Sequence, residues 1–159
     1  NIEAREETRP KDPVELQPLI EQVATDAQAT ISKKHTLDFC CPDNLTIRGD
    51  SNELYSAFSN LVMNAVKHNP EGCNIKIVAE DVGKATTVTI TDDGIGIAPK
   101  HIGRLTERFY RVDKSRATKT GGIGLGLAIV KHVMLRHHGT LSITSKKRQG
   151  ATFTCRFAN

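Results

Sequence analysis

The sequence predicts an α+β fold, a two-layer α/β sandwich in which helices cover one face of a mixed β-sheet. Two observations support this class. Amphipathic segments with a helical period alternate with short β-branched segments, and glycine-rich loops join several of them. The chain has 159 residues, of which 38% are hydrophobic and 25% charged, a composition typical of one globular domain. Its apolar runs are shorter than the roughly 18 residues that cross a bilayer, so we expect a soluble fragment.

The N-terminal part starts with a charged segment. Residues 1–13 contain two prolines and no apolar period, so we interpret them as a linker and expect the domain to span residues 14–159. Residues 18–33 carry five apolar side chains at helical spacing and predict a helix. These side chains are Leu19, Ile20, Val23, Ala27 and Ile31. Short strands are expected at residues 36–40 and 45–48, on either side of a turn.

The central helix has the strongest pattern in the sequence. Asp50 or Ser51 is a suitable N-cap, and the helix is predicted to run from residue 51 to residue 68. One face carries apolar residues at positions i, i+4, i+7 and i+11. They are Leu54, Phe58, Leu61 and Ala65.

The C-terminal half alternates strands, loops and one more helix. The expected elements are strands at 75–80 and 86–91, a loop at 92–97, a short helix at 99–105, a polar segment at 109–122, a helix at 125–136 and a closing hairpin of strands 141–145 and 151–157. With the preceding elements, this order favours helices on one face of a mixed sheet.

The positive charge is local. Residues 104–120 contain six basic and two acidic side chains, which accounts for the whole net charge of +4. A local basic segment suggests a local polyanion, such as the phosphates of a nucleotide. Nucleic acid is disfavoured as a partner, because the segment has few aromatic residues and no known recognition motif.

Four cysteines, Cys40, Cys41, Cys73 and Cys155, have no zinc-binding spacing. We expect free thiols in a reducing compartment, with structural zinc or disulfides as the disfavoured alternatives.

A polar stripe lies beside the apolar face of the central helix. Asn60, Asn64 and Lys67 are spaced i, i+4 and i+7, and so share one side of the helix. An asparagine carbonyl is a hard oxygen ligand suited to Mg²⁺, and a lysine can contact phosphate. The alternative is a solvated polar flank.

The loop Asp92-Asp93-Gly94-Ile95-Gly96-Ile97 directly follows a predicted strand. Its glycines allow the backbone to approach a flat ligand, and a carboxylate at a strand end can accept a hydrogen bond from the amino group of adenine. A tight turn that begins with aspartate is the alternative interpretation.

Glycines also precede the last predicted helix, in the run Gly121-Gly122-Ile123-Gly124-Leu125-Gly126-Leu127. Backbone N–H groups at a helix start form an anion site. The run is neither a P-loop nor a dinucleotide fingerprint. A flexible structural turn is the alternative.

Taken in order, these segments resemble the N, G1, F and G2 boxes of sensor histidine kinases, members of the GHKL superfamily with the Bergerat ATP-binding fold. The F-box equivalent is Glu107-Arg108-Phe109-Tyr110-Arg111, and the resemblance covers about residues 14–158. Residues 104–114 and 124–132 are most similar to the kinases of phosphate-starvation signalling.

The resemblance implies a role for each matching residue in binding ATP and Mg²⁺. Asn64 would hold the metal, with Asn60 one turn before it, while Lys67 would contact phosphate. The remaining implied cofactor-binding residues are His68, in the place of a frequent tyrosine, Asp92 at the adenine, Gly94, Gly96 and Ile97 around it, Phe109, Arg111 and Lys114 in a lid, and Gly122, Gly124, Leu125, Gly126 and Leu127 at the hinge and helix start. Asp93 replaces a common asparagine, and we expect binding to survive this change.

One substitution bears on the type of reaction. Relatives that hydrolyse ATP have a glutamate as general base where this chain has Asn60. An amide cannot take a proton from water, and general-base catalysis contributes about 10²–10⁴-fold. We therefore expect a kinase domain, with a hydrolysing ATPase and a non-catalytic interaction domain as alternatives.

No histidine of the chain has the family's phosphoacceptor context. The resemblance thus implies an acceptor histidine on a separate dimerisation domain, preceding residues 1–13, and a response regulator downstream. It further implies a monomeric fragment that forms the cytoplasmic part of an inner-membrane sensor.

Overall fold

The computed structural model describes residue 10 and residues 12–97, 123–145 and 148–159. The elements are β1 (Asp12–Glu15), α2 (Leu16–Gln28), β2 (His35–Cys40), β3 (Thr46–Gly49), α3 (Ser51–His68), β4 (Cys73–Asp81), β5 (Ala85–Asp92), α5 (Ile123–Arg136), β6 (Thr140–Ser145) and β7 (Ala151–Ala158). The short helix predicted at 99–105 and the polar segment at 109–122 lie outside the described residues.

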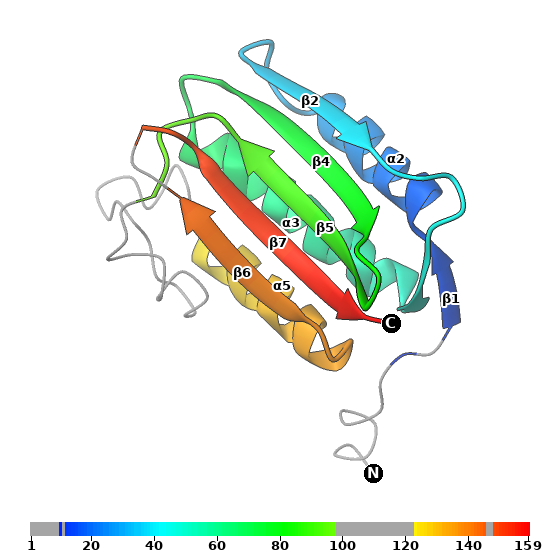
Figure 1. Cartoon of the computed structure of the whole chain (residues 1–159). Coiled ribbons are helices and arrows are strands. Elements are labelled where there is room, and N and C mark those ends of the chain that lie inside the picture. The colour runs from blue at the N-terminus through cyan, green and yellow to red at the C-terminus, as the bar shows by residue number, and fades with distance from the viewer. Residues whose placement is uncertain (1–9, 11, 98–122, 146–147) are drawn as a thin grey trace.

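The main sheet has five strands in the order β2-β4-β5-β7-β6. β2 pairs with β4 in parallel, and the other neighbours are antiparallel. The helices α2, α3 and α5 all lie on one face of this sheet (Figure 1). The predicted two-layer α+β fold with a mixed sheet is therefore confirmed.

The core lies between the sheet and the helices. The apolar face predicted for the central helix is confirmed, because Leu54, Phe58, Leu61 and Ala65 are all buried. Phe58 meets Phe157 of β7 edge to face, with ring centroids 6.4 Å apart. Burying such side chains contributes about 1.5–3 kcal/mol each, so the apolar face of α3 stabilises its packing in the core.

A second, two-stranded sheet was not predicted. β1, which begins within the segment expected as a linker, pairs with β3 so that Val14 lies opposite Ile47, and both side chains are buried. The expected strands at 36–40 and 45–48 exist, but they do not pair with one another. β2 joins the main sheet through β4 instead, because its alternate residues His35 and Leu37 face the core.

The helix predicted at residues 18–33 is shorter at its C-terminal end. α2 ends at Gln28, whose side-chain amide donates to the backbone carbonyl of Leu37, 2.9 Å away. The Thr30 hydroxyl donates to the Ala27 carbonyl and terminates the helix locally. Ile31 still packs against the core, from a turn instead of a helix. Among the described helices, none is long and apolar enough to cross a membrane.

The four cysteines are free thiols, as predicted. Burial raises the pKa of Cys73 to about 11 and that of Cys155 to about 12, so both are protonated at neutral pH.

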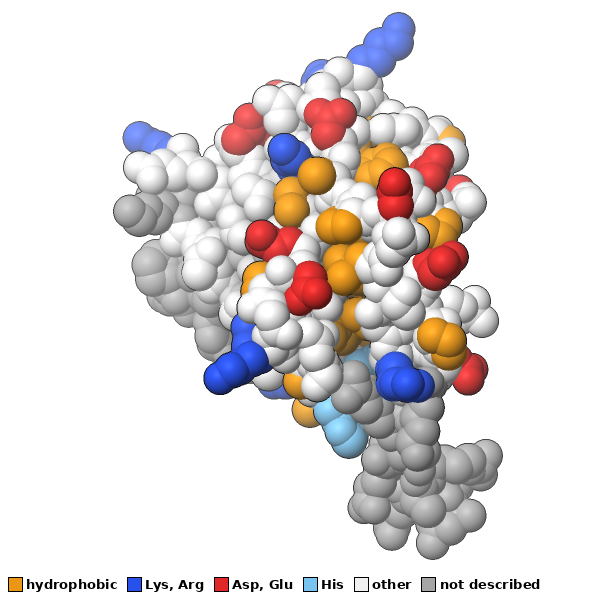
Figure 2. Space-filling view, turned by 45° about the vertical axis from the view of Figure 1, so that its right-hand side comes forward, with side chains coloured by type: hydrophobic (Ala, Val, Ile, Leu, Met, Phe, Trp, Pro, Cys, Tyr) orange, Lys and Arg blue, Asp and Glu red, His pale blue; other side chains and the backbone are white. Residues whose placement is uncertain are grey.

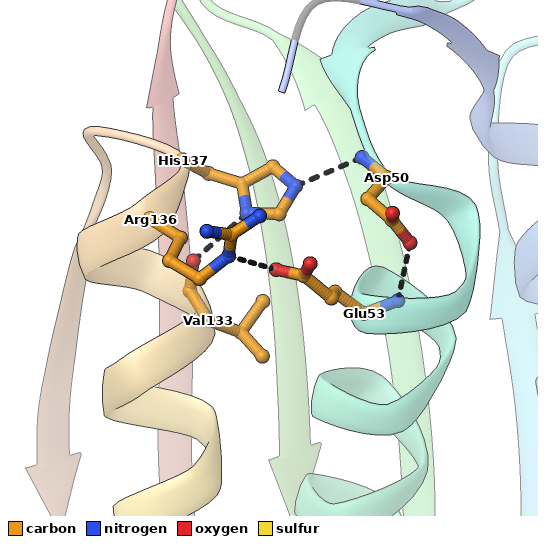
Figure 3. Close-up of polar contacts among 5 residues, drawn as sticks. All are labelled: Asp50, Glu53, Val133, Arg136 and His137. Carbon is orange, nitrogen blue, oxygen red and sulfur yellow. Dashed lines mark hydrogen bonds and ion pairs between the residues drawn. The ribbon is translucent and has the colours of Figure 1, made fainter. Parts of the chain in front are cut away.

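A polar clasp joins the end of α5 to the start of α3 (Figure 3). The backbone N–H of Asp50 donates to His137 Nε2, 3.0 Å away, so the ring proton is on Nδ1, which donates to the Val133 carbonyl. Beside it, Arg136 Nε donates to Glu53 Oε1 over 2.8 Å. His137 is fully buried. The two helices are thus tied at this end by bonds as well as by apolar packing.

The surface around α2 and the neighbouring edge of the sheet carries acidic and basic side chains interspersed with narrow apolar strips (Figure 2). The described side chains on this face form no continuous basic patch.

Candidate functional site

α3 carries the polar stripe, and its ends are well defined. The Asp50 side chain caps the helix by accepting from the Glu53 N–H over 3.0 Å. Lys67 and His68 lie in the last turn, where positive charge complements the helix dipole. The helix therefore holds the stripe rigidly beside the sheet.

Asn64 has an unusual environment. Its side chain is buried, with 8% exposure, and Oδ1 has no hydrogen-bond partner among the described residues. Leaving a buried acceptor unsatisfied costs about 1–3 kcal/mol. A carbonyl oxygen is a ligand that Mg²⁺ prefers. This orphaned atom fits a bound divalent cation.

Asn60, one turn earlier, lies where α3 packs against α5. Its amide donates to the Ser56 carbonyl over 2.7 Å. Its Oδ1 faces Gly126 of α5 so closely that a Cβ on Gly126 would lie 2.9 Å away. A glycine at position 126 therefore lets α5 pack against Asn60.

The C-terminal end of α3 contacts the loop after β5. Lys67 is half-buried. The ring of His68, also half-buried, is hydrogen-bonded through Nε2 to the carbonyl of Gly96, 3.0 Å away. Gly96 has φ +74°, which favours glycine. The structure thus brings together the histidine and the glycine loop that the sequence singled out separately.

Asp92 ends β5 and is buried, with 4% exposure. Its Oδ1 accepts from the Gly94 N–H at 2.9 Å and from the Asn69 side-chain amide at 3.4 Å. Burial raises the pKa of the Asp92 carboxyl above its ordinary value, partly offset by the Gly94 N–H, the charge of His68 and the Asn69 amide. A buried carboxylate with few partners is suited to accept from a ligand.

The neighbouring Asp93 is exposed, and its side chain is hydrogen-bonded to Asn74 of β4. Its two oxygens accept from the backbone N–H of Asn74 at 2.7 Å and from the Asn74 side chain at 2.8 Å. These bonds lower the pKa of Asp93. Asp93 is therefore a structural partner of β4.

The far end of the loop is fastened to the β6–β7 hairpin. The N–H of Ile97 donates to Ser145 Oγ at 2.7 Å, and that hydroxyl donates to the Gly150 carbonyl at 2.8 Å. The Arg148 N–H donates to the Ile95 carbonyl. Ser145 was not predicted, because nothing in its local sequence distinguishes it from a surface strand residue.

The remaining predicted site residues are described only in part. Phe109, Arg111, Lys114 and Gly122 lie outside the described residues. Gly124 and Leu125 belong to the first turn of α5, and Leu127 is buried in the hydrophobic core. The described site therefore consists of the α3 stripe and the loop after β5.

A surface depression of about 820 Å³ lies elsewhere, where β1 meets the start of α3. None of the site residues described above lines it. Chemistry and burial, and not the size of this depression, therefore locate the candidate site.

Residues 49–159 match the family of histidine kinase-, DNA gyrase B-, and HSP90-like ATPases. The phosphate regulon sensor protein PhoR of Pseudomonas aeruginosa is 46% identical over 158 residues, which are 99% of this chain and 36% of that protein. This chain thus spans about a third of the length of that relative.

Solved structures are similar as well. The mycobacterial sensor histidine kinase MprB has a TM-score of 0.79 and 26% identity, with 93% of this chain and 97% of that chain covered. Full-length ShkA in complex with AMPPNP has a TM-score of 0.78 and 26% identity, with 95% of this chain and 32% of that chain covered.

Proposed function

Because this chain belongs to the histidine kinase-, DNA gyrase B- and HSP90-like ATPase family, we propose that it is the catalytic, ATP-binding domain of a sensor histidine kinase. The observation that carries the proposal is Asn64 Oδ1, buried and without a partner among the described residues. The buried Asp92 carboxylate, which contacts Asn69 just beyond the C-terminal end of the same helix, supplies the second contact of an ATP site.

Each described residue has a distinct task in this proposal. Asn64 holds Mg²⁺, and Lys67 contacts the phosphates. Asp92 accepts from the amino group of adenine, while His68 fixes Gly96 at the wall of the pocket. Mg²⁺ held by Asn64 would neutralise the charge of the phosphates. The complex of ShkA with AMPPNP, an ATP analogue, supports a nucleotide at this fold.

The proposed reaction transfers the γ-phosphoryl group to a histidine on a separate domain. The bond from the γ-phosphorus to its bridging oxygen breaks, a phosphorus–nitrogen bond forms, and ADP leaves. Asn60 is an amide that donates to the Ser56 carbonyl, so it cannot serve as a general base for water. With Asn60 in place of a glutamate general base, we expect the phosphoryl group to be kept for a protein acceptor.

The wider setting is also a proposal. Similarity to PhoR supports phosphate-starvation signalling, with an acceptor domain preceding residues 1–13, a response regulator downstream and a membrane-bound parent protein. Phe109 is proposed to anchor a lid, and Arg111 and Lys114 to contact the phosphates or the acceptor domain. Gly122, Gly124 and Gly126 are proposed to let this segment close.

Calorimetry with AMPPNP, with and without Mg²⁺, tests nucleotide binding. We expect Mg²⁺-dependent binding that weakens at least about tenfold in Asp92→Asn, because a carboxylate–amino hydrogen bond is lost. Asp93→Asn, on the outer side of the same turn, is the matched control and should bind like the unchanged protein. Equal affinity in the Asp92 and Asp93 variants would refute the adenine assignment.

A second assay tests the reaction. ATP and a separately expressed acceptor domain of the parent protein are mixed with this chain. Phosphohistidine on that domain supports the kinase, whereas release of inorganic phosphate without it supports the hydrolysing alternative.

A further inference from the structure

Asn69 follows the last residue of α3, and the sequence predicted no binding role for it. It is 2% exposed. Its backbone carbonyl accepts from the N–H of Gly72 at 2.9 Å and is bonded to Nε2 of the buried His35 at 2.7 Å. The position of Asn69 is therefore fixed from β2 and from the turn that follows α3.

The side chain of Asn69 makes three further hydrogen bonds. Its Nδ2 donates to the Ala65 carbonyl at 2.9 Å and to Asp92 Oδ1 at 3.4 Å. Its Oδ1 accepts from the N–H of Ile95 at 2.8 Å. Both the amide nitrogen and the amide oxygen are hydrogen-bonded, so the side chain has one orientation. It connects the helix, the Asp92 carboxylate and the following loop.

Gly94 is folded directly onto this amide. A Cβ at Gly94 would lie 1.9 Å from Asn69 Oδ1. The N–H of Gly94 donates to the same oxygen of Asp92 that Asn69 contacts. Two donors thus converge on Asp92 Oδ1 and restrict rotation of the carboxylate.

We infer that Asn69 is a positioning residue that sets base specificity, by orienting the Asp92 carboxylate and the loop of residues 93–97 toward a purine with a 6-amino group. This inference rests on the proposed function. Gly94 and Asn69 hold Oδ1, and the backbone N–H of Ala151 also bonds the carboxyl group, so the carboxylate presents an acceptor in a fixed orientation to the ligand. An acceptor fixed at this place attracts an amino group and repels the 6-oxo group of guanine, whereas a freely rotating carboxylate discriminates less.

The test compares ATP with purine riboside triphosphate, which lacks the 6-amino group, by calorimetry in Mg²⁺. The unchanged protein should prefer ATP by about tenfold or more. In Asn69→Ala the preference should fall to within about threefold, through weaker binding of ATP alone. If both nucleotides weaken equally, Asn69 is only structural and the inference is overturned.

Asn69→Asp is a second variant, in case the alanine variant does not fold. It has nearly the same shape and still accepts from the N–H of Ile95, but it loses the donor to Asp92. It should also lose the preference for ATP, and a retained preference overturns the inference. Asn74→Ala is the control, because Asn74 holds Asp93 on the outer side of the turn, and its preference should be unchanged.

A double-mutant cycle tests the contact with Gly94. Gly94→Ala alone should weaken ATP binding by about tenfold or more, because its Cβ collides with Asn69. Added to Asn69→Ala, it should cost less than about threefold, since the colliding atoms are gone. Equal costs in both backgrounds count against the inference. An unchanged protein that binds neither nucleotide refutes the proposed function itself, which separates the two failures.

Discussion

Two adjacent carboxylates have opposite environments. Burial raises the pKa of Asp92, whereas the bonds from Asn74 lower the pKa of the exposed Asp93. Asp93 therefore contributes stability above the unfolded pKa near 3.8, and this contribution is lost as the pH falls through its lower folded pKa. Asp92 has the opposite effect on stability. Burial disfavours its charged form in the folded state, so ionisation of Asp92 lowers the free energy of unfolding as the pH rises.

We therefore expect Asp92→Asn to raise the melting temperature of the nucleotide-free protein at pH 7. The folded pKa of Asp92 is raised, so its stabilising contribution is complete below the unfolded pKa of 3.8 and is lost as the pH rises through the folded pKa. Asparagine keeps the oxygen that accepts from Gly94 but removes the buried charge. Calorimetric melting at pH 3 and pH 7 checks this: the gain of a few degrees at pH 7 should shrink at pH 3. A lower melting temperature at pH 7 contradicts it.

At the scale of elements, the clasp between α3 and α5 allows a comparison of buried and exposed contacts. His137 is fully buried and bonds both Asp50 and Val133. His137→Phe leaves the N–H of Asp50 without a partner, while the Val133 carbonyl keeps its bond from the backbone N–H of residue 137, so the free energy of unfolding should fall by about 1–3 kcal/mol. Arg136→Ala removes a half-exposed ion pair and should cost less than about 1 kcal/mol. Urea unfolding of both variants measures the difference, and similar losses would contradict this ranking.

Ser145 connects the loop of residues 93–97 to the β6–β7 hairpin. Ser145→Ala removes the acceptor of the Ile97 N–H and the donor to Gly150. We expect amide hydrogen exchange at Ile97 to speed up by about tenfold, with nucleotide affinity falling only a few-fold. Thr144→Ala, on the exposed face of the same strand, is the control. Unchanged exchange at Ile97 would show that the loop is held without this bond.

Across the whole molecule, the sequence predicted what depends on local pattern. The period of Leu54, Phe58 and Leu61 identified the central helix, and the carboxylate of Asp92 stood out beside its glycines. The pairing of β1 with β3 could not be predicted, because four-residue strands have little periodicity and their partners are distant in the sequence. The role of Asn69 could not be predicted for a similar reason, because its bonds to His35, Asp92 and Ile95 exist only after folding.

Asn64 and Asn69 are five positions apart, one within α3 and the other immediately after it. At a rise of about 1.5 Å per residue, five positions correspond to a separation of roughly 7.5 Å along the helix axis. The helix therefore acts as a ruler between the metal end and the base end of the proposed pocket. One residue inserted between them would turn one end by about 100° relative to the other. An insertion or deletion between these two residues is therefore incompatible with the proposed pocket.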